Sequence, residues 1–265
     1  MKTYLKLELK KTLFSWKTII AILIISMLLM ISYLKEIAFP YPGLDGVDLF
    51  IRICRFSYIG FCGPVVAGLI YSTSIIKDKE SGSLNKVLEI VNAKTYFTVK
   101  LIVSTLITFI VFMVSQGVWV LYLTMKFGIS DVVVAGIAKG AFVGVYRTSK
   151  IAYIILICLA VSLSAAAFST FVLGVTTVTK KKFTSYILPI FYVIVTGILF
   201  DAWSFNNVIN FNVTKLFNLT RNYTIKGYDV IIYDFILILV GTMLLYKFYY
   251  KKIVSLYEIR NQNDL

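Results

Sequence analysis

Long apolar runs alternate along the chain with short charged connections. An α-helix needs about 20 apolar residues to cross the hydrocarbon core of a bilayer, and six runs approach or exceed that length. They cover approximately residues 18–34, 57–76, 101–125, 151–178, 186–202 and 229–248. We therefore expect an all-α integral membrane protein with six membrane-spanning helices between residues 18 and 250.

The composition agrees with a membrane protein and argues against several classes of enzyme. Hydrophobic residues make up 59% of the chain and charged residues 15%, with a mean hydropathy of +0.85, whereas soluble domains are about half apolar and a quarter charged. The chain has no His and three scattered Cys, so it lacks the usual residues for a zinc site or for His-based acid–base catalysis. No paired acids lie inside the runs. We predict no catalytic and no metal-binding residue.

Residues 1–17 are too charged to span a membrane but have the pattern of an amphipathic helix. Its apolar face consists of Leu5, Leu9, Leu13 and Trp16. Lysines at positions 6, 10 and 17 lie together beside that face. A helix of this kind lies in the membrane interface with its lysines near anionic headgroups. Since no small-residue cleavage site follows the first run, we expect a retained interfacial helix rather than a cleaved signal peptide.

The basic residues are distributed unevenly between the two sides of the predicted topology. The chain has 27 Lys and Arg against 13 Asp and Glu, and 17 of those 27 fall on one side, in residues 1–17, 77–100, 179–185 and 247–265. Basic connections favour the cytoplasmic side, so we expect both termini, including a tail at 251–265, in the cytoplasm. Topology accounts for the positive charge, so we predict no nucleic-acid partner. The Lys- and Ile-rich composition indicates a bacterial cytoplasmic membrane.

Two features leave alternatives open. Residues 129–146 are apolar but rich in Gly and interrupted by Asp131 and Lys139, so we expect an outer or re-entrant segment, with a seventh span as the alternative. The second run contains Gly60, Gly63, Pro64 and Gly68. Close helix packing and a gating kink both fit these residues.

The polar segment 77–100 has the pattern of a short surface helix. Its apolar positions recur at i, i+3, i+4 and i+7 and are Leu84, Val87, Leu88 and Val91. Gly82 supplies a turn before this stripe, and Ser81 and Ser83 supply hydroxyls for capping. Asp78 and Glu80 lie toward its positive N-terminal end. Because both ends of the segment enter the bilayer, it is suited to transmit a push, although a solvated loop is the alternative.

This segment resembles a pattern in ABC-2 type transporter permeases. The matching residues are the run Asp78–Leu84, then Val87, Leu88, Lys94, Tyr96, Lys100 and Leu101. The layout of the whole chain is also similar to that family, with an interfacial N-terminal helix, six spans and a polar segment between the second and third. The chain departs from the family in Asn92-Ala93, where many relatives have a Pro, and in a long connection at 126–150.

The resemblance implies a fold, a function and a set of partners. A separate ABC ATPase subunit would bind ATP and Mg and dock on this segment, while this chain, which has no phosphate-binding loop, would hold no cofactor. The implied coupling residues are Asp78, Glu80, Ser81, Gly82, Ser83, Leu84, Val87, Leu88 and Lys94. A second permease chain would complete the transporter. Its expected cargo is an amphipathic compound such as an antimicrobial peptide, lantibiotic or drug.

Three polar residues in or near the spans are candidates for a substrate path. They are Gln116, Asp201 and Asp234, because polar and ionisable groups within membrane are often functional. For Gln116, a hydrogen bond between helices is the alternative. An ion-gradient-driven secondary transporter or channel is the competing function. It predicts inverted repeats or several charges near the midplane, and neither is evident in the sequence.

Overall fold

The computed structural model describes residues 1–38, 43–179, 181–202, 211–221 and 225–250, and in these ranges the chain contains helices and no β-strand. Six helical stretches are long and apolar enough to cross a membrane. The prediction of an all-α fold with six helices long and apolar enough to span a membrane is therefore confirmed. The predicted tail at 251–265 lies outside the described residues.

The six stretches follow one another as the sequence pattern predicts. They are α2 (Trp16–Ala38), α4 (Ile59–Ile70) with α5 (Ser74–Glu80), α7 (Ala93–Phe127), α9 (Lys150–Thr179), α10 (Lys182–Ile194) with the π-helical η1 (Val195–Leu199), and α13 (Gly227–Met243) with η3 (Leu244–Tyr250). Short helices complete the chain: α1 (Lys2–Leu13), α3 (Gly46–Phe56), α6 (Ser83–Ile90), α8 (Val143–Thr148), α11 (Phe200–Ala202) and α12 (Val213–Leu216).

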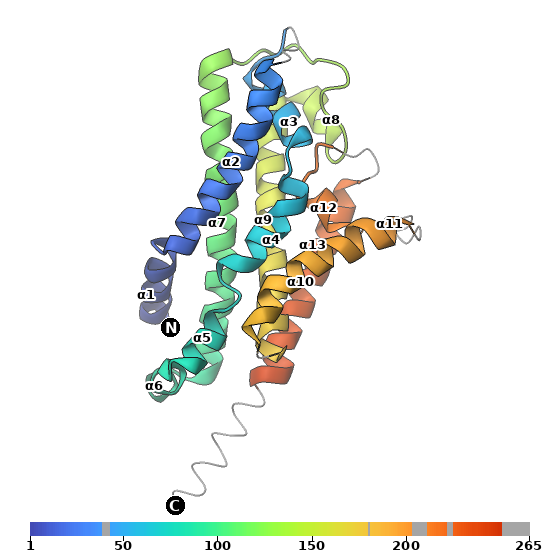
Figure 1. Ribbon diagram of the computed structural model, residues 1–265. Coiled ribbons are helices and arrows are strands. Elements are labelled where there is room, and N and C mark those ends of the chain that lie inside the picture. The colour runs from blue at the N-terminus through green and yellow to red at the C-terminus, as the bar shows by residue number, and fades with distance from the viewer. Residues whose placement is uncertain (39–42, 180, 203–210, 222–224, 251–265) are drawn as a thin grey trace, which may run out of the picture.

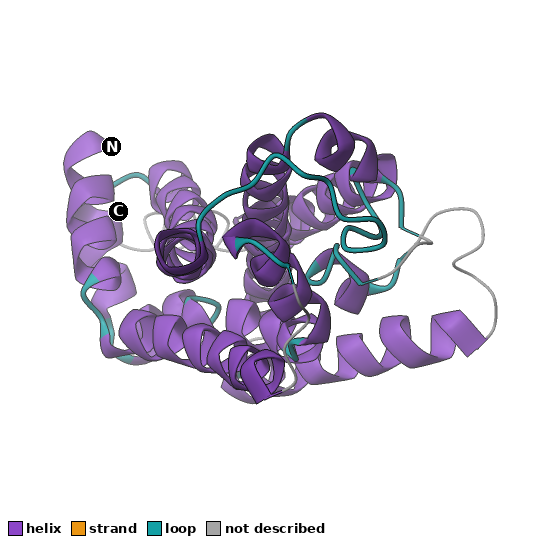
Figure 2. Cartoon of the chain, turned by 90° about the horizontal axis from the view of Figure 1, so that it is seen from above, coloured by secondary structure: helices purple, strands orange, loops and turns teal. Residues whose placement is uncertain are grey.

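Helices α7 and α9 form the centre of the bundle (Figure 1). Around them pack α2, α4 and α13. Helix α10 packs on α4 and α9, and its continuation extends away from the bundle, as the view from above shows (Figure 2). Helices α9 and α13 cross closely, because a Cβ added at Gly174 would lie 2.5 Å from the carbonyl oxygen of Gly241. Small residues permit such an approach in lipid.

The second span is broken where α4 ends and α5 begins. Residues Tyr71, Ser72 and Thr73 separate the two helices, and all three are buried. Within α4, a Cβ at Gly68 would lie 2.5 Å from Pro189 of α10. This contact favours close packing as the reason for glycine in α4.

The end of the bundle opposite α1 and α6 contains two helices that the sequence pattern did not predict, α3 and α8 (Figure 1). Residues 46–56, which fall between the first two predicted spans, form α3, most of which is buried. Residues 129–146 contain turns and the start of α8, with no helix long enough to span a membrane in that described range. The seventh-span alternative is therefore not supported, and the segment packs over the bundle end.

Candidate functional site

Helices α5 and α6 form an elbow, which we define as residues 74–90, at the end of the bundle near α1 (Figure 1). The predicted apolar stripe does face the protein: Leu84 is buried, and Val87 and Leu88 are partly buried. These side chains pack with Tyr96 and Phe97 of α7. The opposite face of α6 is exposed, as expected for a helix on the surface.

Gly82 forms the turn of the elbow with φ of +70°, a conformation that costs little for glycine alone. The hydroxyls of Ser81 and Ser83 do not cap α6, which has no side-chain cap. Both donate instead to the carbonyl oxygen of Asp78, each at 3.2 Å. The prediction of a capping hydroxyl is therefore wrong. Asp78 lies in the last turn of α5, where carbonyl oxygens have no partner within the helix.

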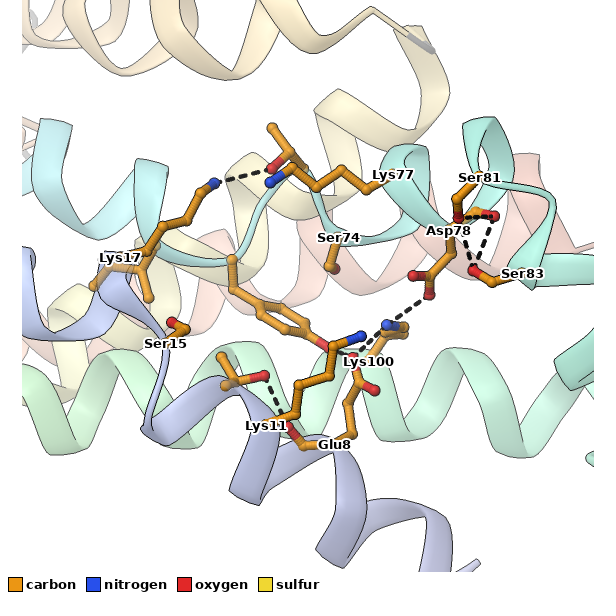
Figure 3. Close-up of a pocket in the computed structure, with 14 residues that line it drawn as sticks. Glu8, Lys11, Ser15, Lys17, Ser74, Lys77, Asp78, Ser81, Ser83 and Lys100 are labelled. Carbon is orange, nitrogen blue, oxygen red and sulfur yellow. Dashed lines mark hydrogen bonds and ion pairs between the residues drawn. The ribbon is translucent and has the colours of Figure 1, made fainter.

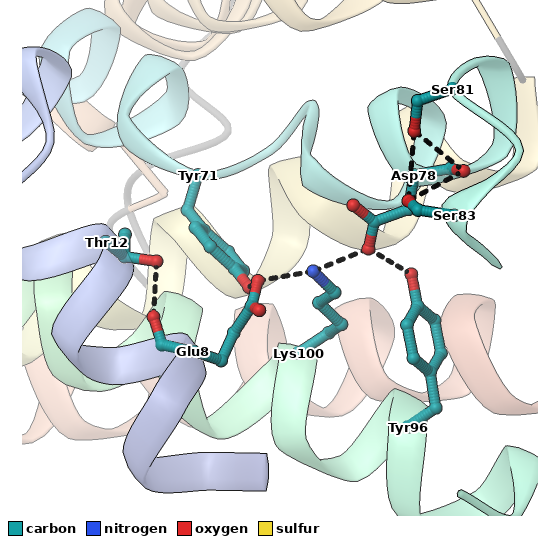
Figure 4. A network of polar contacts seen from close by, with 8 residues as sticks. All are labelled: Glu8, Thr12, Tyr71, Asp78, Ser81, Ser83, Tyr96 and Lys100. Carbon is teal, nitrogen blue, oxygen red and sulfur yellow. Dashed lines mark hydrogen bonds and ion pairs between the residues drawn. The ribbon is translucent and has the colours of Figure 1, made fainter. Parts of the chain in front are cut away.

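Behind the elbow lies an ion cluster, which we define as Glu8, Asp78 and Lys100 (Figure 4). The Lys100 ammonium is 2.7 Å from Asp78 Oδ2, also pairs with Glu8 Oε1, and its side chain is only 1% exposed. Tyr71 donates to Glu8 and Tyr96 donates to Asp78, both at 2.7 Å. The cluster thus joins α1 to α5 and α7, both of which are far from it in sequence.

The helix α1 contacts the bundle through a more polar face than predicted. Leu5, Leu9 and Leu13 are partly buried, but the buried positions of α1 are Glu8 and Thr12. Trp16 belongs to α2 and is 78% exposed. Sequence reasoning missed Glu8, although it is the one acid in residues 1–17. A single acid among several lysines was the feature of the sequence that could have identified Glu8 as a residue of the site.

Tyr4 extends the cluster along α1. Its ring stacks on Tyr96, with ring centroids 6.2 Å apart. Burial, followed by the nearby negative charges of Glu8 and Asp78, raises the pKa of the Tyr4 phenol above its ordinary value. Tyr4 therefore stays neutral at physiological pH.

The other predicted coupling residues lie on or beside the elbow without entering the cluster. Glu80 forms an ion pair with Lys182 at the start of α10, and both side chains are about half exposed. Lys94 is exposed in the first turn of α7. That helix begins earlier than the predicted span because the Asn92 side chain accepts a hydrogen bond from the Thr95 amide.

A cleft of about 480 Å³ opens beside the cluster, between α1, the start of α2, α5 and α7 (Figure 3). Its polar lining combines ammonium and hydroxyl groups with the carboxylates of Glu8 and Asp78. The lining residues with ammonium or hydroxyl groups are Lys11, Thr12, Ser15, Lys17, Tyr71, Thr73, Ser74, Lys77, Ser81, Ser83 and Lys100. Sequence reasoning did not predict this cleft, because its walls come from segments far apart in the chain.

The three predicted substrate-path residues do not form one site among the described side chains. Gln116 is 2% exposed and donates to the carbonyl oxygen of Phe112 in its own helix. Asp234 accepts from Ser164 at 2.9 Å across the α9–α13 contact, and its Oδ1 has no hydrogen-bond partner. Asp201 belongs to α11, and its side chain lies outside what the structure describes.

A second polar cluster, at the opposite end of the bundle, was also missed by sequence reasoning. The Lys150 ammonium lies 2.9 Å from Asp45 and 2.7 Å from Asp48. Tyr146 donates to Asp48, and the Asp45 side chain caps α3. This cluster fixes α3 to the start of α9. In the described part of the chain, no group of three or more His, Cys, Asp or Glu is placed to hold a metal ion.

Comparisons of this chain with protein-family models, with curated proteins and with solved structures found no match.

Proposed function

We propose that this chain is the membrane-spanning permease subunit of an ATP-driven exporter of the ABC-2 type. A separate ATPase subunit would bind ATP and Mg and press on the elbow, and a second permease chain would complete the transporter. The proposal places the complex in a bacterial cytoplasmic membrane with the elbow and both termini in the cytoplasm. The resemblance of residues 78–84 to the family pattern supports it.

The observation that carries the proposal is the connection between the elbow and the bundle. The elbow is held to α1 and α7 by the buried Lys100 with its two carboxylates. Breaking a buried ion pair by removing one partner costs about 3–5 kcal/mol, so the three elements are expected to move together. A force applied to α6 would therefore reach two other helices rather than be absorbed by a loose loop.

Helix α7 is long enough to carry such a displacement across the membrane. Its 35 residues give a length of about 52 Å at 1.5 Å per residue, against about 30 Å for the hydrocarbon core. The surface of α6 available to a partner includes Asn85, Lys86, Glu89 and Ile90, and Ile90 is 87% exposed. A charged rim around an exposed apolar side chain is suited to a protein contact.

The cargo is proposed from the family resemblance alone. An amphipathic compound such as an antimicrobial peptide, lantibiotic or drug fits an exporter of this size and layout. Expression of the chain with its ATPase should then protect cells from the compound.

Copurification with an ATPase subunit tests the proposed function. An ABC ATPase subunit should copurify with the chain, and the reconstituted pair should hydrolyse ATP and move substrate. Deleting residues 80–84 should abolish both assembly and transport, and Gly82→Val should weaken both, because a β-branched residue is strained at positive φ. As a control, Gly136→Val changes a glycine of positive φ at the other end of the bundle. Full assembly and transport by the deletion variant would contradict the proposal.

One observation favours the competing function, an ion-gradient-driven transporter. Asp234 lies inside a spanning helix with a buried oxygen that has no hydrogen-bond partner, and intramembrane acids serve in proton and ion pathways. Transport that persists in vesicles without any ATPase, and that Asp234→Asn abolishes, would establish this function instead.

A further inference from the structure

The cleft beside the ion cluster has more positive charge than its own carboxylates neutralise. Lys100 is occupied by Glu8 and Asp78. Among the described residues, no carboxylate forms an ion pair with Lys11, Lys17 or Lys77. The cleft therefore has three ammonium groups available to a ligand.

Two of these ammonium groups lie together. Lys17 is half-buried, donates to Thr73 Oγ1 at 3.3 Å, and is close enough to Lys77 for the two charges to repel one another (Figure 3). Like charges placed together are unfavourable unless an anion lies between or beside them. Hydroxyls of Ser15, Thr73 and Ser81 line the same cleft. The ammonium groups of Lys17 and Lys77, with the Thr73 hydroxyl beside them, match the acceptor oxygens of a phosphate group.

The surroundings of the cleft favour a lipid as the source of that phosphate. Ser15 and Lys17 line the cleft, while their neighbours Phe14 and Trp16 are 73% and 78% exposed. The apolar surface continues along α2, where Ile20 and Leu23 are about half exposed. A phosphate in the cleft would thus have an apolar surface beside it for acyl chains.

We propose that this cleft binds the phosphate headgroup of an anionic phospholipid of the inner leaflet, held by Lys17 and Lys77 with Lys11 at the rim. Its volume of about 480 Å³ lies within the range of small-molecule sites. Bound there, the lipid contacts α1, α2 and α5 at once. It adds a second connection between the N-terminal helix and the elbow, beside the ion cluster.

Lipid binding to the purified full chain tests this proposal, and it needs no ATPase. The protein is placed in nanodiscs of phosphatidylcholine with increasing phosphatidylglycerol, and retained lipid is counted by native mass spectrometry. Lys17→Gln with Lys77→Gln should weaken phosphatidylglycerol retention about tenfold or more, because each lysine near a lipid surface contributes about 1 kcal/mol. The matched control is Lys6→Gln with Lys10→Gln, which removes the same charge from exposed positions of α1 outside the cleft.

Two further measurements distinguish loss of lipid binding from loss of folding and a lipid headgroup from a free phosphate ion. Lys17→Arg with Lys77→Arg preserves the charge and should retain the lipid, which separates loss of binding from loss of folding. Inorganic phosphate should compete only weakly. Equal retention by the cleft and control variants would overturn the proposal. Binding of inorganic phosphate with no preference for phosphatidylglycerol over phosphatidylcholine would overturn it in favour of a free anion. Full retention by the cleft variant, with loss of a copurifying ATPase, would overturn it in favour of a protein contact.

Discussion

Lys100 holds together three elements that the sequence separates, and its environment sets what its loss should do. Removing the ammonium leaves the mostly buried carboxylates of Glu8 and Asp78 without the cation that they share. We expect Lys100→Met to destabilise the purified protein by about 3–5 kcal/mol, measured by thermal unfolding in detergent. Adding Glu8→Gln and Asp78→Asn should restore much of that loss, because the triple variant buries no unpaired charge.

The control for this prediction is Lys94→Met, an exposed position in the first turn of the same helix. Exposed substitutions usually change stability by less than about 0.5 kcal/mol. A Lys100→Met protein as stable as Lys94→Met would show that the ion cluster does not hold α1 and the elbow to α7.

Asp45, in the cluster at the other end of the bundle, should make part of the protein's folding stability depend on pH in the acid range. Burial raises the pKa of its carboxyl, but hydrogen bonds from the Asp48 amide and from Lys150 outweigh burial, so the pKa lies below the ordinary value of 3.8. The native state therefore gains stability above that value and loses it as pH falls through the lower native pKa. Asp45→Asn keeps a capping side chain and should flatten the fall in unfolding temperature as the pH drops below about 4. An unchanged pH profile in this variant would contradict the assignment.

At the scale of elements, the close crossing of α9 and α13 leads to a matched pair of glycine substitutions. A Cβ at Gly174 would lie 2.5 Å from the backbone of Gly241, whereas nothing lies within 4 Å of a Cβ at Gly117 in α7. We expect Gly174→Ala to destabilise by about 1–3 kcal/mol, because the helices must separate. Gly117→Ala should be neutral or stabilising by up to about 1 kcal/mol. Thermal unfolding of both variants measures the difference, and equal values would contradict the crossing.

The elements that sequence predicted well are those whose pattern is local. The six spans follow from apolar run length, and α6 follows from Leu84, Val87 and Leu88 at helical spacing. Helix α3 was missed because Asp48 and Arg52 interrupt its apolar residues. Its burial depends on Lys150, which is distant in sequence. Likewise the pairing of Glu8 with Lys100 cannot be read from either segment alone. Long-range charge pairs were the part of the candidate site that sequence could not supply.

At the scale of the whole molecule, the two charged clusters lie at opposite ends of a bundle centred on α7 and α9. If an ATPase drives this chain through the elbow, the force enters the bundle at the ion cluster of Glu8, Asp78 and Lys100. Glu8→Gln should then lower the amount of substrate moved per ATP hydrolysed, because α1 no longer follows the elbow and α7. Proteoliposomes containing this chain and the proposed ATPase measure this ratio directly.

The matched control for coupling is Lys182→Gln, which breaks the half-exposed ion pair with Glu80 and leaves the buried cluster intact. Exposed pairs contribute about 0–1 kcal/mol, so this variant should keep a ratio near that of the unaltered protein. A ratio that falls equally in both variants would locate coupling in the surface of the elbow and not in the cluster behind it. A ratio unchanged by Glu8→Gln, with the protein still folded, would mean that α7 alone transmits the push and that α1 only supports the elbow.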